Sequence, residues 1–199
     1  MRRGVTLLEI AVVIAIIGIL GALSVASLQS IRSRAVFGGA AGDLMGALRQ
    51  TRSEALGRGQ ATAFIIDTVG GQYWGIQTTS AFDVTTFSPA TSIYITDGSL
   101  PRGVTFGPST GYGAALPAPM TGIPISTKCS YCVTSPAGYG AIVFDPGGRA
   151  TFSVGTGGIQ AAGSGIGQQF TLTSTRDNVL RLMAVTIIGQ TGAIESFER

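Results

Sequence analysis

The stretch from Val5 to Leu28 is the feature that most restricts how this chain can fold. It is almost entirely apolar, and no charged residue occurs from Ile10 to Ile31. A run of about 20 apolar residues is long enough to cross a bilayer as a helix. Arg2 and Arg3 precede it, and such basic residues are typical of the side that stays in the cytoplasm. We therefore expect this stretch to lie in a membrane or in the core of an assembly.

A single acid, Glu9, lies near the start of this stretch and separates three interpretations of it. An ordinary signal peptide needs a cleavage site of small residues, for which Ser24-Val25-Ala26 is a candidate, and a plain anchor needs only apolar length. Both leave a carboxylate in apolar surroundings, at a cost on the order of a few kcal/mol unless it has a partner. In the third interpretation, the chain is cut before Val5, and the new α-amine lies within reach of a neighbouring subunit's acid.

The residues Gly4-Val5-Thr6-Leu7-Leu8-Glu9 and the apolar tail resemble the type III leader of type IV prepilins and type II secretion pseudopilins. The resemblance implies that a membrane-embedded prepilin peptidase cleaves after Gly4 and methylates the new N-terminal residue, Val5. Phenylalanine is commonest at that place in the family, so Val5 departs from the pattern. The match favours the third interpretation over a signal peptide, which would leave a chain that begins at Ser27.

The apolar pattern then becomes amphipathic without a proline, the first of which is Pro89. One helical face is predicted to hold Phe37, Ala41, Leu44, Leu48, Thr51 and Ala55, and the opposite face Gly39, Gly42, Gly46, Arg49, Gln50 and Ser53. One helix is thus expected from about Val5 to about Arg58, roughly 80 Å long at about 1.5 Å per residue. Since the hydrocarbon layer is only about 30 Å thick, the second half of the helix must lie outside it, and its apolar face must be buried against the rest of the chain.

Gly38, Gly39 and Gly42 interrupt the helical pattern, because each interior glycine costs about 1 kcal/mol relative to alanine. Two explanations are open at this point. One is a kink or a locally melted turn, and the other is close packing of small residues against a neighbouring helix.

From Gly59 onward the apolar residues follow the period of β-strands. Strands are predicted over residues 61–67, 72–78, 92–96, 140–145, 150–154, 168–174, 180–188 and 193–197, with turns at 69–71, 145–148 and 189–192. Segments 97–139 and 155–167 are rich in proline or glycine and are predicted as loops. The expected fold class is α+β, with the long helix packed on one antiparallel sheet.

Composition argues against catalysis. The chain has no histidine, so the commonest general base and the commonest transition-metal ligand are both absent. The glycine-rich run at 155–167 lacks the Gly-Lys-Ser/Thr of a phosphate-binding loop. Scattered acids are expected at turns or strand ends, among them Asp67, Asp83, Asp97 and Asp177. We expect no enzyme, no metal and no cofactor.

Cys129 and Cys132 are the only cysteines, and their spacing is that of a redox motif or of half a zinc site. Zinc needs about four ligands, which this chain cannot supply. A thioredoxin-like motif begins a helix in a βαβ unit, whereas prolines and strand-like residues surround this one. We predict a local disulfide that pins the loop before the strand at Gly140, in an oxidising compartment.

Three later segments extend the resemblance: the helix end at 47–55, the hairpin at 142–150, and a final pair from Leu180-Arg181-Leu182 to Thr191-Gly192. They are similar to the H-type subgroup, which comprises the H pseudopilin of type II secretion and the FimT/FimU minor pilins. The resemblance implies a pilin fold. Its parts would be a leader at 1–4, a membrane or filament-core half-helix at 5–28, an amphipathic half-helix at 29–58 and a periplasmic β-rich domain at 59–199.

The function implied by this resemblance is structural. The chain would be a minor subunit near the filament tip that initiates or caps a type IV pilus or a type II secretion pseudopilus. Before assembly it would span the inner membrane once, with its C-terminal domain in the periplasm. Its implied partners are other pilins or pseudopilins, the prepilin peptidase, the inner-membrane assembly platform and the lipid bilayer. Glu9 is expected to neutralise a neighbour's N-terminal amine during assembly.

Two alternative functions stay open. FimT-type members take part in DNA uptake through a basic stretch near the C-terminus, but residues 192–196 contain no arginine and one acid, Glu195. Phosphate contacts need cations, and only Arg181 and Arg199 are nearby, so nucleic acid is not an expected partner. The second alternative is a membrane-tethered binding domain that never assembles, which predicts that residues 1–4 are retained.

Overall fold

The structure is a computed structural model that describes residues 7–107, 128–133, 138–153, 159–161, 167–174, 180–189 and 191–198. For residues 22–30 and 159–161 it describes the backbone only. The chain divides into two compact units, which we call the helical unit (Met1–Val36) and the β-rich unit (Phe37–Arg199). The described residues form an α+β protein with antiparallel sheets, as predicted at that level.

Helix α1 (Leu7–Arg58) is an α-helix of 52 residues that contributes to both units. Its predicted end is confirmed, because Gly59 follows with a φ of 63° and its N–H donates to the Ala55 carbonyl at 3.0 Å. A glycine in this left-handed conformation is a common way to end a helix. The backbone stays helical through Gly38, Gly39 and Gly42, so the melted turn is wrong.

Ten strands occur in the described residues, and they form two sheets rather than the one predicted. Their bounds are β1 (Thr62–Asp67), β2 (Gln72–Gln77), β3 (Tyr94–Ser99), β4 (Val104–Phe106), β5 (Tyr139–Phe144), β6 (Ala150–Ser153), β7 (Ile159–Ala161), β8 (Gln168–Ser174), β9 (Arg181–Ile188) and β10 (Ala193–Glu198). Sheet A has the order β3-β2-β1-β5-β6-β7, and sheet B has the order β10-β9-β8-β4. Along the chain, β1 to β3 belong to sheet A, β4 to sheet B, β5 to β7 to sheet A again, and β8 to β10 to sheet B.

All eight predicted strands are present, most of them within two residues of their expected bounds. The loop predictions were partly wrong, because β4 and the end of β3 lie within 97–139 and β7 lies within 155–167. Both missed strands have three residues, too few to show a period of two. They exist through their pairing with β8 and β6, which is a tertiary effect.

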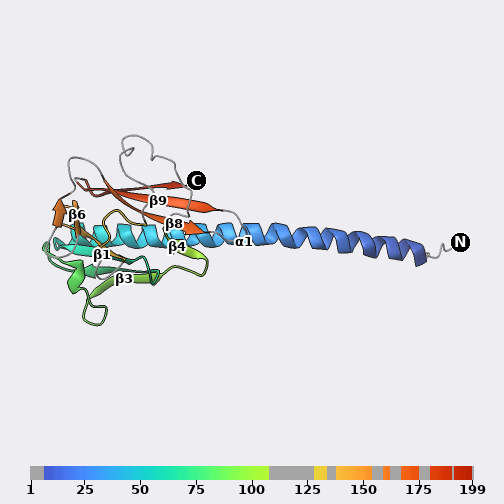
Figure 1. Ribbon diagram of the computed structural model, residues 1–199, viewed down its shortest axis with the longest axis horizontal. Coiled ribbons are helices and arrows are strands. Elements are labelled where there is room, and N and C mark those ends of the chain that lie inside the picture. The colour runs from blue at the N-terminus through green and yellow to red at the C-terminus, as the bar shows by residue number, and fades with distance from the viewer. Residues whose placement is uncertain are drawn as a thin grey trace. The chain divides into compact units, whose positions relative to one another are not determined.

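The inner core surrounds the part of α1 that belongs to the β-rich unit. Figure 1 shows β8 and β9 on one side of this part of the helix and β1 and β3 on the other. The predicted faces are confirmed, since all six residues of the apolar face are buried and all six of the opposite face are exposed. Leu44 and Leu48 are fully buried, which stabilises the fold by about 2 kcal/mol each.

Thr51 fits the helix against sheet A. Its hydroxyl donates to the Ala47 carbonyl at 2.8 Å, and its own carbonyl accepts from Thr62 Oγ1 at 2.8 Å. A Cβ added to Gly75 in β2 would overlap Thr51 Oγ1, so only glycine allows this close approach. The buried Thr51 is therefore hydrogen-bonded through both its hydroxyl and its carbonyl where the helix meets sheet A.

A second core covers the outer face of sheet A, and the sequence did not predict it. The connection between β2 and β3, which contains the 3₁₀-helix η1 (Val84–Thr86), packs over this face. Trp74 lies at its centre, with ring centroids 5.2 Å from Phe87 and 6.3 Å from Tyr139. Because both faces of the sheet are covered, all six residues of β1 are buried.

Candidate functional site

Glu9 lies in the first turn of α1, inside a segment that is exposed on every side. Each of the fifteen residues from Leu7 to Gly21 is exposed, and Leu7, Ile14 and Ile17 expose 86%, 64% and 64% of their surface. Fifteen helical residues make about four turns, so no face of the segment 7–21 is covered. Burying a large aliphatic side chain yields about 1.5–3 kcal/mol, a gain that this segment does not obtain within the chain.

The position of Glu9 has a local benefit as well as a cost. A carboxylate in the first turn of a helix interacts favourably with the helix dipole, by about 0.3–1 kcal/mol. That interaction alone would make Glu9 a helix-start residue with no further role. The apolar side chains around it, Leu8 and Ile10 among them, make this carboxylate costly once the segment leaves water.

Several sequence predictions fall outside the described residues. Gly4 and Val5, the predicted cleavage and methylation sites, are among them, and so are the side chains of 22–28 in the predicted span 5–28. Where the side chains are described, the structure contains no helix that is both long enough and apolar enough for a membrane crossing.

Arg52 joins the three segments that carry the resemblance beyond the leader. Its Nε donates to the Gly148 carbonyl in the β5–β6 turn at 3.3 Å, and its Nη2 donates to the Thr191 carbonyl in the β9–β10 turn at 2.8 Å. A Cβ on Gly192 would overlap the Gly148 carbonyl oxygen, so the two turns are in direct contact. One side chain of α1 thus ties a turn of sheet A to a turn of sheet B.

The arrangement around Arg52 is structural rather than catalytic. Gly148 and Gly192 have φ values of 76° and 62°, the left-handed conformation that favours glycine. The N–H of Ala150 donates to the Gly189 carbonyl at 2.8 Å and adds a second link between the turns. The sequence predicted the helix end and both turns, but nothing in it predicted that one arginine connects them.

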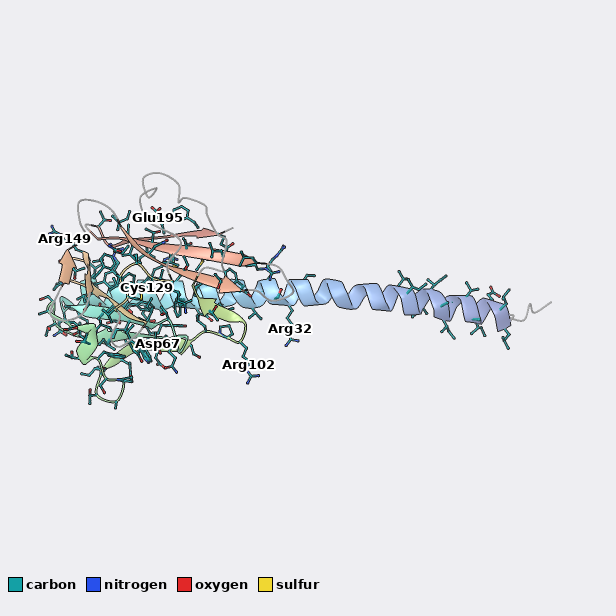
Figure 2. All side chains as sticks on the ribbon, in the orientation of Figure 1. Arg32, Asp67, Arg102, Cys129, Arg149 and Glu195 are labelled. Carbon is teal, nitrogen blue, oxygen red and sulfur yellow. A yellow bond between two sulfur atoms is a disulfide. The ribbon has the colours of Figure 1, made fainter. Side chains whose placement is uncertain are left out.

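The predicted disulfide is confirmed between Cys129 and Cys132. Figure 2 shows Cys129 among the side chains of the β-rich unit. The sulfurs lie against β5, because a Cβ on Gly140 would be 2.7 Å from Cys132 Sγ and 3.1 Å from Cys129 Sγ. The disulfide therefore lies directly against Gly140, a contact that the prediction of a pinned loop before this strand did not include.

The segment 128–133 also connects the two sheets. On the sheet B side, Ser130 N donates to the Gln169 carbonyl at 2.9 Å, and Thr171 N donates to the Lys128 carbonyl at 3.1 Å. On the sheet A side, Val133 N donates to the Tyr139 carbonyl at 2.7 Å. The disulfide thus closes a segment that holds β8 and β5 together, which the sequence did not predict.

Tyr131 lies between the two cysteines and is the largest fully buried side chain of this segment. Its ring centroid is 5.3 Å from that of Phe152 in β6. Among the described residues its hydroxyl has no hydrogen-bond partner, and burial raises the pKa of this phenol well above its ordinary value. A buried, unsatisfied hydroxyl is a cost to the fold.

Two of the four acids predicted at turns or strand ends, Asp67 and Asp83, have the expected structural place. Asp67 Oδ1 accepts from the N–H groups of Val69 and Gly70, each at 2.9 Å, and Asp83 caps η1 through Thr85 N at 2.9 Å. Asp97 lies within β3, so its predicted place at a strand end was wrong, and Asp177 lies outside the described residues. In the part of the chain that the structure describes, no group of three or more His, Cys, Asp or Glu residues is arranged to hold a metal.

Burial of the Tyr139 phenol, followed by the nearby charge of Asp67 and a hydrogen bond to it, raises the pKa of Tyr139. Tyr139 and Asp67 are directly paired across β5 and β1. Burial likewise raises the pKa of Tyr73, with smaller contributions from the Asp43 and Asp97 carboxylates. All of these shifts keep the phenols neutral at physiological pH.

Comparison of the chain with models of protein families, with curated proteins and with solved structures finds no match.

Proposed function

We propose that this chain is a structural minor pilin or pseudopilin, cleaved after Gly4 and incorporated near the tip of a type IV pilus or a type II secretion pseudopilus. It spans the inner membrane before assembly, with the β-rich unit in the periplasm. It adopts the pilin fold, with the first half of α1 in the membrane or in the filament core. Its role is to initiate or cap assembly through contacts with other pilin-like subunits.

The observation that carries the proposal is the change of burial along α1. Residues 7–21 are apolar apart from Glu9 and are exposed on every side, whereas residues from Phe37 to Ala55 present one fully buried face to the sheets. A helix exposed all round and apolar all round is stable only in a membrane or among other helices. The leader-like residues ahead of it and Glu9 in its first turn favour a filament over a simple anchor.

The Arg52 junction supports a structural role for the subgroup-like segments. A binding or catalytic motif places polar groups where a ligand can reach them. Here the polar groups of Arg52, Gly148 and Thr191 are used in joining the helix to two turns. These segments therefore hold the β-rich unit together and leave the assembly function to the helix.

DNA uptake is less well supported. The last strand, β10, carries exposed Glu195 and Glu198, and within its described residues it contains no arginine or lysine. Acidic side chains repel phosphate, so this strand is unsuited to DNA. Salt-dependent binding of DNA by the protein would reverse this conclusion.

The mature N-terminus tests the proposal. The full-length chain is produced together with a prepilin peptidase, and mass spectrometry of the membrane fraction identifies its first residue. We expect N-methylated Val5, and we expect the Gly4→Leu variant to keep its leader. A wild-type chain that keeps Met1, or one that begins at Ser27, would contradict the proposal.

A further inference from the structure

Two arginines, Arg32 and Arg34, follow directly after the uncharged segment of α1. Both are exposed, and so is Ile31, with 63% of its surface accessible. Among the described residues, Arg58 and Glu54 form an ion pair, whereas neither Arg32 nor Arg34 is paired with an acid. Figure 2 shows the Arg32 side chain projecting away from the helix.

The spacing of these arginines determines which partner they suit. Residues two apart on an α-helix are separated by about 160° around its axis, so they do not share a face. The exposed Ile31 lies on the arc between them, and the buried Ser33 lies on the other side. One acidic patch on a protein faces one side of a helix, whereas a layer of lipid phosphates extends around it.

The position along the helix fits the same partner. From Leu7 to Ile31 the helix rises about 36 Å, slightly more than the roughly 30 Å hydrocarbon thickness. Arg32 and Arg34 then lie at the level of the headgroups. Arginine stems can lie along apolar surface while their guanidinium groups reach outward, and guanidinium forms two parallel hydrogen bonds with a phosphate.

We propose that Arg32 and Arg34 form a binding site for phosphate-bearing phospholipid headgroups at the outer surface of the membrane that α1 crosses, and so fix the depth of the subunit before assembly. This inference rests on the proposed membrane location. It assigns to these residues a lipid partner and not a neighbouring subunit.

The test has two parts. First, the full-length chain is reconstituted into liposomes and extracted at alkaline pH; a chain that is released contradicts the membrane part of the proposed function. Second, the detergent-solubilised chain is titrated with phosphatidylglycerol, and native mass spectrometry gives the apparent Kd for the wild type, for R32Q/R34Q and for R102Q/R149Q. The last pair removes two exposed arginines of the β-rich unit and serves as the charge-matched control.

We expect R32Q/R34Q to bind phosphatidylglycerol about 25-fold more weakly, or about fivefold per arginine, and the control to match the wild type. Equal affinities of R32Q/R34Q and the wild type would overturn the inference, and so would an equal loss in the control. Displacement of the lipid by an equal concentration of inorganic phosphate would assign the site to a free anion instead. Unchanged lipid affinity with lost filament incorporation would assign it to a protein neighbour. A chain that resists extraction but fails the titration leaves the proposed function in place.

Discussion

The two halves of α1 have the same backbone conformation but differ in what surrounds their side chains. Residues 7–21 are apolar apart from Glu9 and are exposed on every side, while residues from Phe37 to Ala55 are amphipathic and bury one face against two sheets. In the second half the apolar surface is already covered within the chain. In the first half, the described apolar side chains of residues 7–21 have no such cover, and this difference is the basis of the proposal that they contact a membrane or other subunits.

The largest effect is expected from Glu9→Leu, which tests the exposed first half of α1 directly. Leaving one partner of a buried ion pair without the other costs about 3 kcal/mol, so incorporation into filaments should fall on the order of 100-fold. Membrane insertion, processing and the unfolding of the β-rich unit should not change. The measurement is the ratio of filament to membrane protein by quantitative immunoblot.

Glu54→Leu is the matched control, since Glu54 lies on the same helix and pairs with Arg58 in the exposed part of the second half. It should assemble normally. Normal assembly of Glu9→Leu would remove the proposed role of Glu9.

The second prediction reverses the comparison. Leu48 is fully buried, so Leu48→Ala should destabilise the β-rich unit by about 3 kcal/mol through the cavity it leaves. Ile17→Ala, which shortens a side chain that is 64% exposed, should change stability by less than about 0.5 kcal/mol. Denaturant unfolding of the full chain in detergent measures both. Equal effects would mean that the two halves do not differ in burial.

The third prediction concerns the two sheets that bury the second half of α1. Removing the disulfide with Cys129→Ser/Cys132→Ser should destabilise the fold by about 2 kcal/mol, the value for a ring of this small size. The amide of Gln169 donates to Ser130 Oγ and that of Thr171 to the Lys128 carbonyl, so hydrogen exchange should rise at both amides when the segment 128–133 loosens. Exchange of residues 7–21 should not change. An increase confined to 128–133 would show that the segment does not hold the sheets together.

The fourth prediction uses two glycines with opposite surroundings. A Cβ on Gly42 would meet nothing within 4 Å, so Gly42→Ala should stabilise the fold by about 0.5–1 kcal/mol. Gly75→Ala should destabilise it, because the new Cβ overlaps Thr51 Oγ1. Thermal unfolding of the two variants gives the sign of each change.

Gly42→Ala also addresses the alternative left open for these glycines. Close packing of small residues against a neighbouring subunit predicts a variant that is more stable yet assembles less well. A variant that is more stable and assembles normally would exclude that packing.

The smallest effect is expected from Tyr131→Phe. The Tyr131 hydroxyl is buried without a partner among the described residues, so its removal should leave stability unchanged or raise it by up to about 1 kcal/mol at neutral pH. Burial raises the pKa of this phenol in the folded state, so the wild type should lose stability as the pH rises above about 10. The phenylalanine variant should lose less, and parallel pH profiles of unfolding would contradict the assignment.

The sequence by itself determined the local structure. The faces of α1, its end at Gly59 and the eight longer strands follow from the spacing of apolar residues and from glycine, which are local properties. The leader-like residues were identified instead by their resemblance to type IV prepilins, and the role of Glu9 stays a prediction. The disulfide followed from the absence of other ligands for Cys129 and Cys132.

Only the tertiary structure decided how these pieces meet. Several features join residues that are far apart in the chain. They are the division into two sheets, the three-residue strands β4 and β7, the outer core around Trp74, and the links made by Arg52 and by 128–133. Arg52 and Thr191 are separated by 139 positions, and no local pattern reports such a contact. Periodicity shows which face of an element needs a partner, but the partner is selected by the packing of the whole β-rich unit.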